Sequence, residues 1–181
     1  NIMKKGMLYM FIFMLLFGIA SEDTFALSNG RIIPGRQTIS YNVQGYKKIK
    51  SLNIEYEYGI SQTLAGEVKF LKGENSNYLD LFLKFKLHED STLDISGRLG
   101  LQSDFLTATE TEKLLGVTFT KNNSSFLKWN GGAEYSLDSK DLGYFIGIDY
   151  SLTNNSTFQA GWQDFASRDL RGWVIGLRTE L

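Results

Sequence analysis

The side chains most useful for catalysis and metal binding are scarce in this sequence. It contains one histidine, His88, and no cysteine. Thiolate nucleophiles, disulfides and cysteine metal sites are therefore excluded, and a catalytic triad would depend on His88 alone. His88 stands beside Glu89 and Asp90 in a segment typical of a surface turn, where a histidine has an ordinary structural explanation. The sequence shows no glycine-rich phosphate loop, HExxH motif or nucleophile elbow. We therefore expect no enzymatic activity, no metal site and no cofactor.

Two polar segments have the oxygen-rich composition of calcium-binding loops, residues 72–77 and 138–141. Neither has the ligand spacing of a known calcium site, so both are predicted to be solvated loops. The chain carries 19 Lys and Arg residues against 20 Asp and Glu residues. This balance argues against nucleic acid as a partner, because nucleic-acid-binding proteins usually carry a basic excess.

Residues 1–26 have the composition of a secretory signal peptide. Two lysines precede a nearly unbroken apolar run over residues 7–19, which is short for a membrane-spanning helix. Cleavage is expected after Ala26 or after Ala20, where small residues occupy the required positions. The alternative is a retained N-terminal anchor helix, although no stop-transfer charges follow the apolar run.

Beyond residue 37 the dominant pattern is strict alternation of apolar and polar residues, which indicates strands with two different faces. In residues 52–60 every even position is apolar, and Asn53, Glu55 and Glu57 lie between them. Nine segments of about ten residues alternate in this way. That length allows a tilted strand to cross a bilayer.

Four short turns rich in Asn, Asp and Ser join these segments into hairpins. They begin at Ser61, Asp90, Asn123 and Asn155. If the final strand descends to the periplasm, all four turns lie on that side, and a rising strand must precede residue 48. Residues 37–43 are the segment that supplies it, which brings the count to ten. Phe126 stands at a position where the alternation of its strand has polar residues, and a β-bulge near residues 130–132 would restore the alternation.

The sequence therefore predicts an all-β fold, a closed antiparallel up-and-down barrel of about ten strands (eight to ten) over residues 37–181. A signal peptide and a short extension over residues 27–36 precede it. Which face of the barrel meets water decides its environment. A soluble lipocalin-like barrel points its apolar face inward, whereas a transmembrane barrel points it outward.

Aromatic residues on the apolar face fall near the two ends of the strands, and the positions between them are largely aliphatic. Such girdles are typical of membrane interfaces, because amphipathic rings settle at headgroup depth. The predicted girdle at the turn end consists of Tyr58, Phe85, Phe119, Tyr150 and Phe158. The predicted girdle at the opposite end consists of Phe70, Tyr135, Tyr144, Trp162 and Trp173.

Charges of both signs occupy the other face in the middle of the strands. In a narrow barrel they would pair across the lumen in a plugged, hydrogen-bonded core. In a soluble barrel they would form the solvated outer face. The candidate lumen-facing charges are Glu55, Glu67, Asp80, Lys84, Asp94, Arg98, Lys128, Glu134 and Asp149.

This architecture, from residue 37 onward, resembles that of small bacterial outer-membrane β-barrel proteins. The resemblance implies export to the cell outer membrane of a Gram-negative-type bacterium, with the lipid bilayer as a partner. It also implies recognition by the outer-membrane assembly machinery through the C-terminal strand. Trp173, Ile175, Leu177 and Leu181 fit the alternating pattern of such strands, whereas Thr179 and the terminal leucine depart from it.

Three functions fit this resemblance and the residues. The first is a structural or interaction role for a barrel with a plugged lumen. The second is a porin-like narrow pore for small solutes, since the inward glycines Gly116, Gly132, Gly143 and Gly147 would leave space. The third is a soluble, exported, lipocalin-like carrier of an apolar ligand. In the membrane reading, the longest outer loop, residues 102–110, is the best place for a partner to bind.

Overall fold

The computed structural model describes residues 29–45, 49–72, 77–104, 111–165 and 170–181. The predicted signal peptide, both cleavage sites and the start of the extension lie outside these residues. No helix in the described part of the chain is long and apolar enough to span a membrane.

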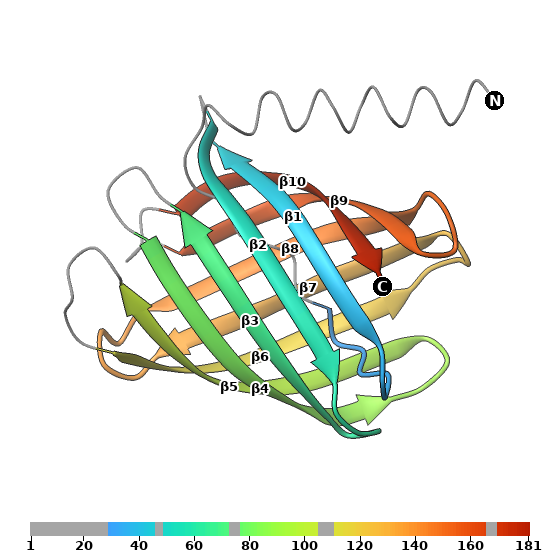
Figure 1. Ribbon diagram of the computed structural model, residues 1–181, viewed down its shortest axis with the longest axis horizontal. Coiled ribbons are helices and arrows are strands. Elements are labelled where there is room, and N and C mark those ends of the chain that lie inside the picture. Colours follow the sequence, from blue (N-terminus) through green and yellow to red (C-terminus); the bar gives the residue numbers. More distant parts are fainter. Residues whose placement is uncertain (1–28, 46–48, 73–76, 105–110, 166–169) are drawn as a thin grey trace.

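Ten antiparallel strands form a closed barrel (Figure 1). They are β1 (Gln37–Gly45), β2 (Ile49–Gly59), β3 (Leu64–Lys72), β4 (Asn77–Glu89), β5 (Leu93–Asp104), β6 (Glu112–Asn122), β7 (Leu127–Ser136), β8 (Leu142–Ser151), β9 (Ser156–Phe165) and β10 (Leu170–Glu180). Each strand pairs with its neighbours in sequence, and β1 pairs with β10 to close the sheet. The predicted closed up-and-down barrel of ten strands is confirmed, including the first strand that was inferred from the need for an even count.

The barrel is polar inside and apolar outside. Among the described residues, 25 buried side chains are polar or charged and only eight are hydrophobic. Twenty-four large hydrophobic side chains are exposed instead, with Leu81, Leu101 and Ile146 each close to half exposed on the outer wall. An apolar exterior of this extent is unfavourable in water and favourable in lipid. The lipocalin-like alternative, which requires the apolar face to point inward, is therefore wrong.

The four predicted turns share one hydrogen-bonding pattern. In each, a backbone N–H donates to the carbonyl three residues ahead, from Ser61 to Leu64, Asp90 to Leu93, Ser124 to Leu127 and Thr153 to Ser156, at 3.0 to 3.1 Å. The side-chain oxygen of the first residue also accepts a backbone N–H two or three residues ahead. This is the mechanism by which short polar side chains favour turns.

This pattern corrects the sequence alignment of the turns. The third turn begins at Ser124, one residue later than predicted, and the fourth begins at Thr153, two residues earlier. Phe126 therefore lies in the turn, and β7 begins at Leu127. The register of β7 with both neighbours runs through residues 130–132 without a shift, so the predicted bulge is wrong. Register shifts instead occur at Gln44/Gly45 and at Lys86/His88.

Inward-facing phenylalanine rings lie over glycines on the neighbouring strand. A Cβ atom on Gly143 would lie 1.8 Å from Phe165, and one on Gly132 would lie 2.8 Å from Phe145. The inner wall repeats this arrangement between Phe82 and Gly100. The space that Gly132 and Gly143 were predicted to leave open is therefore filled by aromatic rings. A glycine in a strand often marks such a close approach.

Candidate functional site

A chain of buried ion pairs runs across the lumen from β2 to β7. The Nζ atom of Lys69 lies 3.5 Å from Glu55 and 3.1 Å from Glu67. The guanidinium group of Arg98 lies 2.6 Å from the same Glu67 and 3.7 Å from Glu134. All five side chains are at most 3% exposed. Because β2, β3, β5 and β7 supply them, the chain of charges ties together separate parts of the barrel wall.

Arg98 is the centre of this network. Its guanidinium carbon lies 3.8 Å from the centroid of the Phe82 ring, and the Lys69 ammonium lies 5.3 Å from the same centroid. A cation over an aromatic face gains electrostatic stabilisation, and more so when water is excluded. Phe82 faces Gly100 across the β4–β5 pair, so the missing side chain leaves room for the ring on which Arg98 stacks.

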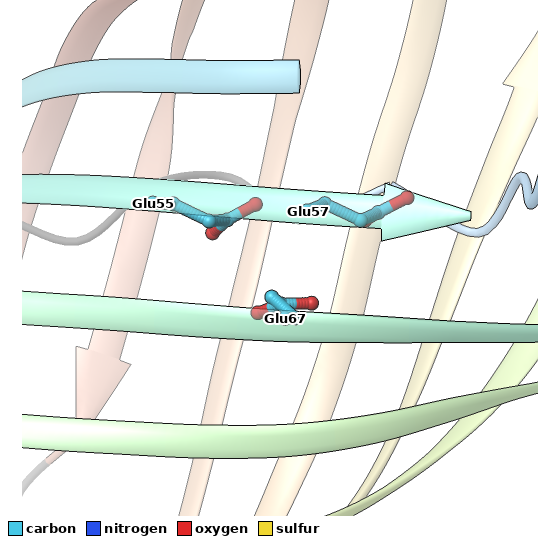
Figure 2. A group of neighbouring side chains, drawn as sticks. All are labelled: Glu55, Glu57 and Glu67. Carbon is cyan, nitrogen blue, oxygen red and sulfur yellow. The ribbon is translucent and has the colours of Figure 1, made fainter. Parts of the chain in front are cut away.

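Two glutamates of the network and the neighbouring Glu57 form a compact carboxylate group, shown in Figure 2 on two adjacent strands. Carboxylate oxygens of Glu55, Glu57 and Glu67 all lie within 4.8 Å of one another. The protein supplies cations to all three, because Lys84 lies 2.7 Å from Glu57 while Lys69 contacts the other two. The geometry is thus that of an internally compensated ion network, in which a metal ion would have to displace ammonium groups.

The remaining predicted lumen charges fall into two groups. Asp80 accepts a hydrogen bond from Gln102 at 2.7 Å, and Asp149 lies 2.9 Å from Arg178; both are buried in the lumen. Asp94 and Lys128 lie nearer the turn end, where they line a pocket. Glu57, Lys69 and Arg178 are also buried on the inward face; the alternation places them there, although none was among the candidate lumen charges.

The extension before β1 folds into the turn-end mouth of the barrel. Its described part, residues 29–36, is called the strap here. The backbone N–H of Gly30 donates to Thr120 Oγ1 at 2.8 Å, and Ser96 donates its hydroxyl to the Gly30 carbonyl. The Nζ atom of Lys84 donates to Asn29 Oδ1 at 3.2 Å. The strap thus crosses from β1 to the inner faces of β4, β5 and β6.

A tight turn directs the strap inward. The Arg36 N–H donates to the Ile33 carbonyl at 3.2 Å, and Pro34 and Gly35 occupy the two central positions. Gly35 has a φ of 72°, which fits the third position of a type II turn and favours glycine. The Ile33 carbonyl approaches so closely that it occupies the space of a side chain at Gly59. The turn therefore packs directly on the end of β2.

The opposite end of the lumen is closed by apolar side chains. Leu71, Phe145, Phe165 and Val174 form a buried cluster, and Tyr78 packs against it. The lumen is thus filled along its length by this apolar cluster, the ion network and the strap. A water-filled channel would expose its lining, whereas Arg98, Lys84 and Asn130 at the lumen wall are at most 2% exposed.

All ten aromatic residues predicted to form girdles are half-buried or exposed on the outer wall. Tyr58 pairs with Gly66 and Phe158 with Leu177 close to the turns, whereas Trp162 and Trp173 face each other near the other end. Tyr41 and Tyr56 are also exposed on the outer wall, although neither was predicted to belong to a girdle.

The lone histidine, predicted to lie in a turn, lies instead near the exposed end of β4, where it pairs with Ile95 of β5. His88 Nε2 lies 2.9 Å from Asp90 Oδ2, and the backbone N–H groups of Thr92 and Leu93 donate to Asp90 Oδ1. The His88 contact and these backbone donors hold the pKa of Asp90 well below its ordinary value. These contacts join the end of β4 and the start of β5 to the turn between them, so their evident role is to hold that turn.

Of the three predicted loop segments, only residues 138–141 lie wholly within the described residues. In the segment 138–141, Asp138 accepts the Lys113 backbone N–H at 2.7 Å, so it fixes a loop to the neighbouring strand. In the longest outer loop, residues 102–104 belong to β5, and residues 105–110 lie outside the described residues. Most of the segment 72–77 also lies outside them.

No protein-family model matches the sequence, and no curated protein matches it either. Two solved structures of the KdgM porin are similar in fold, one of them in complex with disordered oligogalacturonate. Each has a TM-score of 0.55 and 10% sequence identity, and the match covers 80% of this chain and 99% of the porin chain. The N-terminal β-barrel domain of Pseudomonas aeruginosa OprF also matches, with a TM-score of 0.41 and 13% identity over 82% of this chain and 98% of that one. The match to the KdgM porin shows that the two proteins share a β-barrel fold.

Proposed function

We propose that the protein is an integral outer-membrane β-barrel with a structural or interaction role in the cell envelope and no enzymatic activity. The observation that carries the proposal is the filled lumen inside an apolar outer wall. The ion pairs of Lys69 and Arg98 link the inner wall from β2 to β7. A solute could pass only if these side chains and the strap moved aside.

Export and orientation belong to the same proposal. A signal peptide over residues 1–26 would deliver the chain, and the four short turns and the strap would face the periplasm, as turns of this length do in membrane barrels. The assembly machinery would read the C-terminal strand. This part is supported by the exterior positions of Trp173, Ile175 and Leu177 on β10, which pairs with β1 to close the barrel.

A narrow pore for small solutes is the second candidate. The polar inner wall favours it, because polar side chains that rearrange could line a passage. Ten strands nevertheless enclose little space once side chains fill the barrel, since open aqueous channels generally need about 16 strands.

Conductance in planar lipid bilayers separates the two candidates. The full chain is reconstituted into bilayers, with the KdgM porin measured under the same conditions as a reference. We expect insertion without a steady conductance, because buried ion pairs and hydrogen-bonded side chains occupy the lumen. A steady, ohmic channel in most insertion events would instead establish the narrow pore and reject the structural role.

A further inference from the structure

A polar pocket of about 540 Å³ opens at the turn end of the barrel, outside the strap. Arg31 of the strap forms one side, and the β4–β5 and β6–β7 turns form others. Asp94 and Lys128 also line it, close to the starts of β5 and β7. Its volume lies in the range of sites for small molecules. The pocket is separate from the ion network of the lumen.

One buried carboxylate of this pocket has an oxygen atom without a hydrogen-bond donor. Asp94 is 2% exposed, and its Oδ2 atom accepts no hydrogen bond from any residue that the structure describes. The neighbouring acids differ, because Glu89 is bonded to the Lys86 ammonium and Asp90 to His88. Leaving a buried carboxylate oxygen unsatisfied is costly, so this atom points to a positively charged hydrogen-bond donor.

Two cations share the pocket with Asp94. Within the described ranges, neither the Arg31 guanidinium nor the Lys128 ammonium forms an ion pair or a side-chain hydrogen bond. Every other basic side chain described within the lumen has an acidic partner, as Lys69, Lys84 and Arg98 do. The pocket therefore holds two cations without a hydrogen-bonded acidic partner and one carboxylate oxygen without a donor, and Glu89 and Asp90 lie at its edge.

We infer that this pocket binds the head group of an acidic amino acid, which carries one ammonium group and two carboxylates. Asp94 would accept the ammonium group, and Arg31 and Lys128 would bind the carboxylates, for which a guanidinium offers paired donors. Ser91 and Ser124 on the flanking turns supply neutral polar groups. The head group could belong to a free amino acid or to a short peptide. This inference goes beyond the proposed envelope role and holds whether or not the barrel conducts.

Isothermal titration calorimetry on the full chain in detergent tests the inference with L-glutamate and γ-glutamylglycine as probes. At least one should bind with a Kd below about 1 mM. Binding of both identifies the head group alone as the ligand, and binding of γ-glutamylglycine alone identifies a peptide-borne head group. N-acetylglutamate lacks the ammonium group and should bind at least tenfold more weakly than the probe that binds. No binding of either probe, or equal binding of N-acetylglutamate, overturns the inference.

Variants locate the site. D94N and K128M should each weaken binding of the probe at least tenfold, because each removes one charge contact worth about 1.4 kcal/mol. K128M serves as the second variant in case the buried Asp94 is needed for folding. D138N, in an exposed loop at the other end, is the matched control and should leave the Kd unchanged. Equal Kd values for K128M and D138N would place the probe elsewhere and contradict the assignment.

Discussion

Replacing Arg98 with methionine is expected to lower the free energy of unfolding by about 3–5 kcal/mol, because the variant withdraws the cation from two buried carboxylates. Glu67 lies 2.6 Å and Glu134 3.7 Å from the guanidinium group. The stacking of Arg98 on Phe82 is lost as well. Urea unfolding in lipid vesicles, followed by tryptophan fluorescence, measures the change.

The matched control is R171M. Arg171 lies 3.3 Å from Asp164, but its side chain is 69% exposed. An exposed pair of this kind contributes about 0–1 kcal/mol. A second test combines R98M with E67Q and E134Q, which removes the charges that Arg98 compensates and should recover part of the loss. If R98M costs no more than R171M, the ion network does not hold the lumen as described.

Replacing Gly30 with leucine is expected to expel the strap from the barrel mouth. A Cβ atom there would lie 2.4 Å from the Asp94 carbonyl oxygen and 2.8 Å from the Thr120 nitrogen, both backbone atoms of the barrel wall. Backbone atoms of a closed barrel cannot shift at low cost, whereas the strap can leave. Arg31 and Arg36 are trypsin sites, so we expect at least tenfold faster cleavage, which corresponds to about 1.4 kcal/mol of lost protection.

Gly35 provides the control for this variant. It has a φ of 72° and no atom within 4 Å of its Cβ position. Asparagine tolerates this conformation, so G35N should leave the strap bound and the cleavage rate close to that of the unmodified protein. Rapid cleavage of the unmodified protein, with no further increase in G30L, would mean that the strap does not occupy the mouth in solution.

The alternation of apolar and polar residues was sufficient to predict the barrel, because each strand shows its two faces in its own residues. A period of two shows which residues share a face, and an even strand count required Gln37–Gly45 as β1. The same rule assigns Glu57, Lys69 and Arg178 to the inward face. Alternation alone did not show which face meets water, and the structure resolves this with apolar side chains such as Leu81 outside.

What the sequence could not supply depends on contacts between distant residues. The pairing of Arg98 with Glu134 joins strands that are not adjacent, so it follows from the curvature of the closed barrel. Gly30 reaches Thr120 from 90 positions away in the sequence, and no periodicity marks that contact. The turn beginning at Thr153 was misaligned because Ser, Thr, Asn and Asp all suit turns, and composition does not fix the phase.

The central claim is that the barrel spans a membrane. Its most direct test measures whether the outer wall contacts lipid or water. The sequence has no cysteine, so single cysteines at Leu81, Val117 and Ile146 can carry nitroxide labels, with Asn154 in an exposed turn as the aqueous reference. Electron paramagnetic resonance of the full chain in lipid vesicles then compares collisions with oxygen and with a water-soluble nickel complex. We expect the three wall labels to be accessible to oxygen and protected from nickel, and the Asn154 label to show the reverse. Wall labels as accessible to nickel as the Asn154 label would contradict the membrane-spanning barrel.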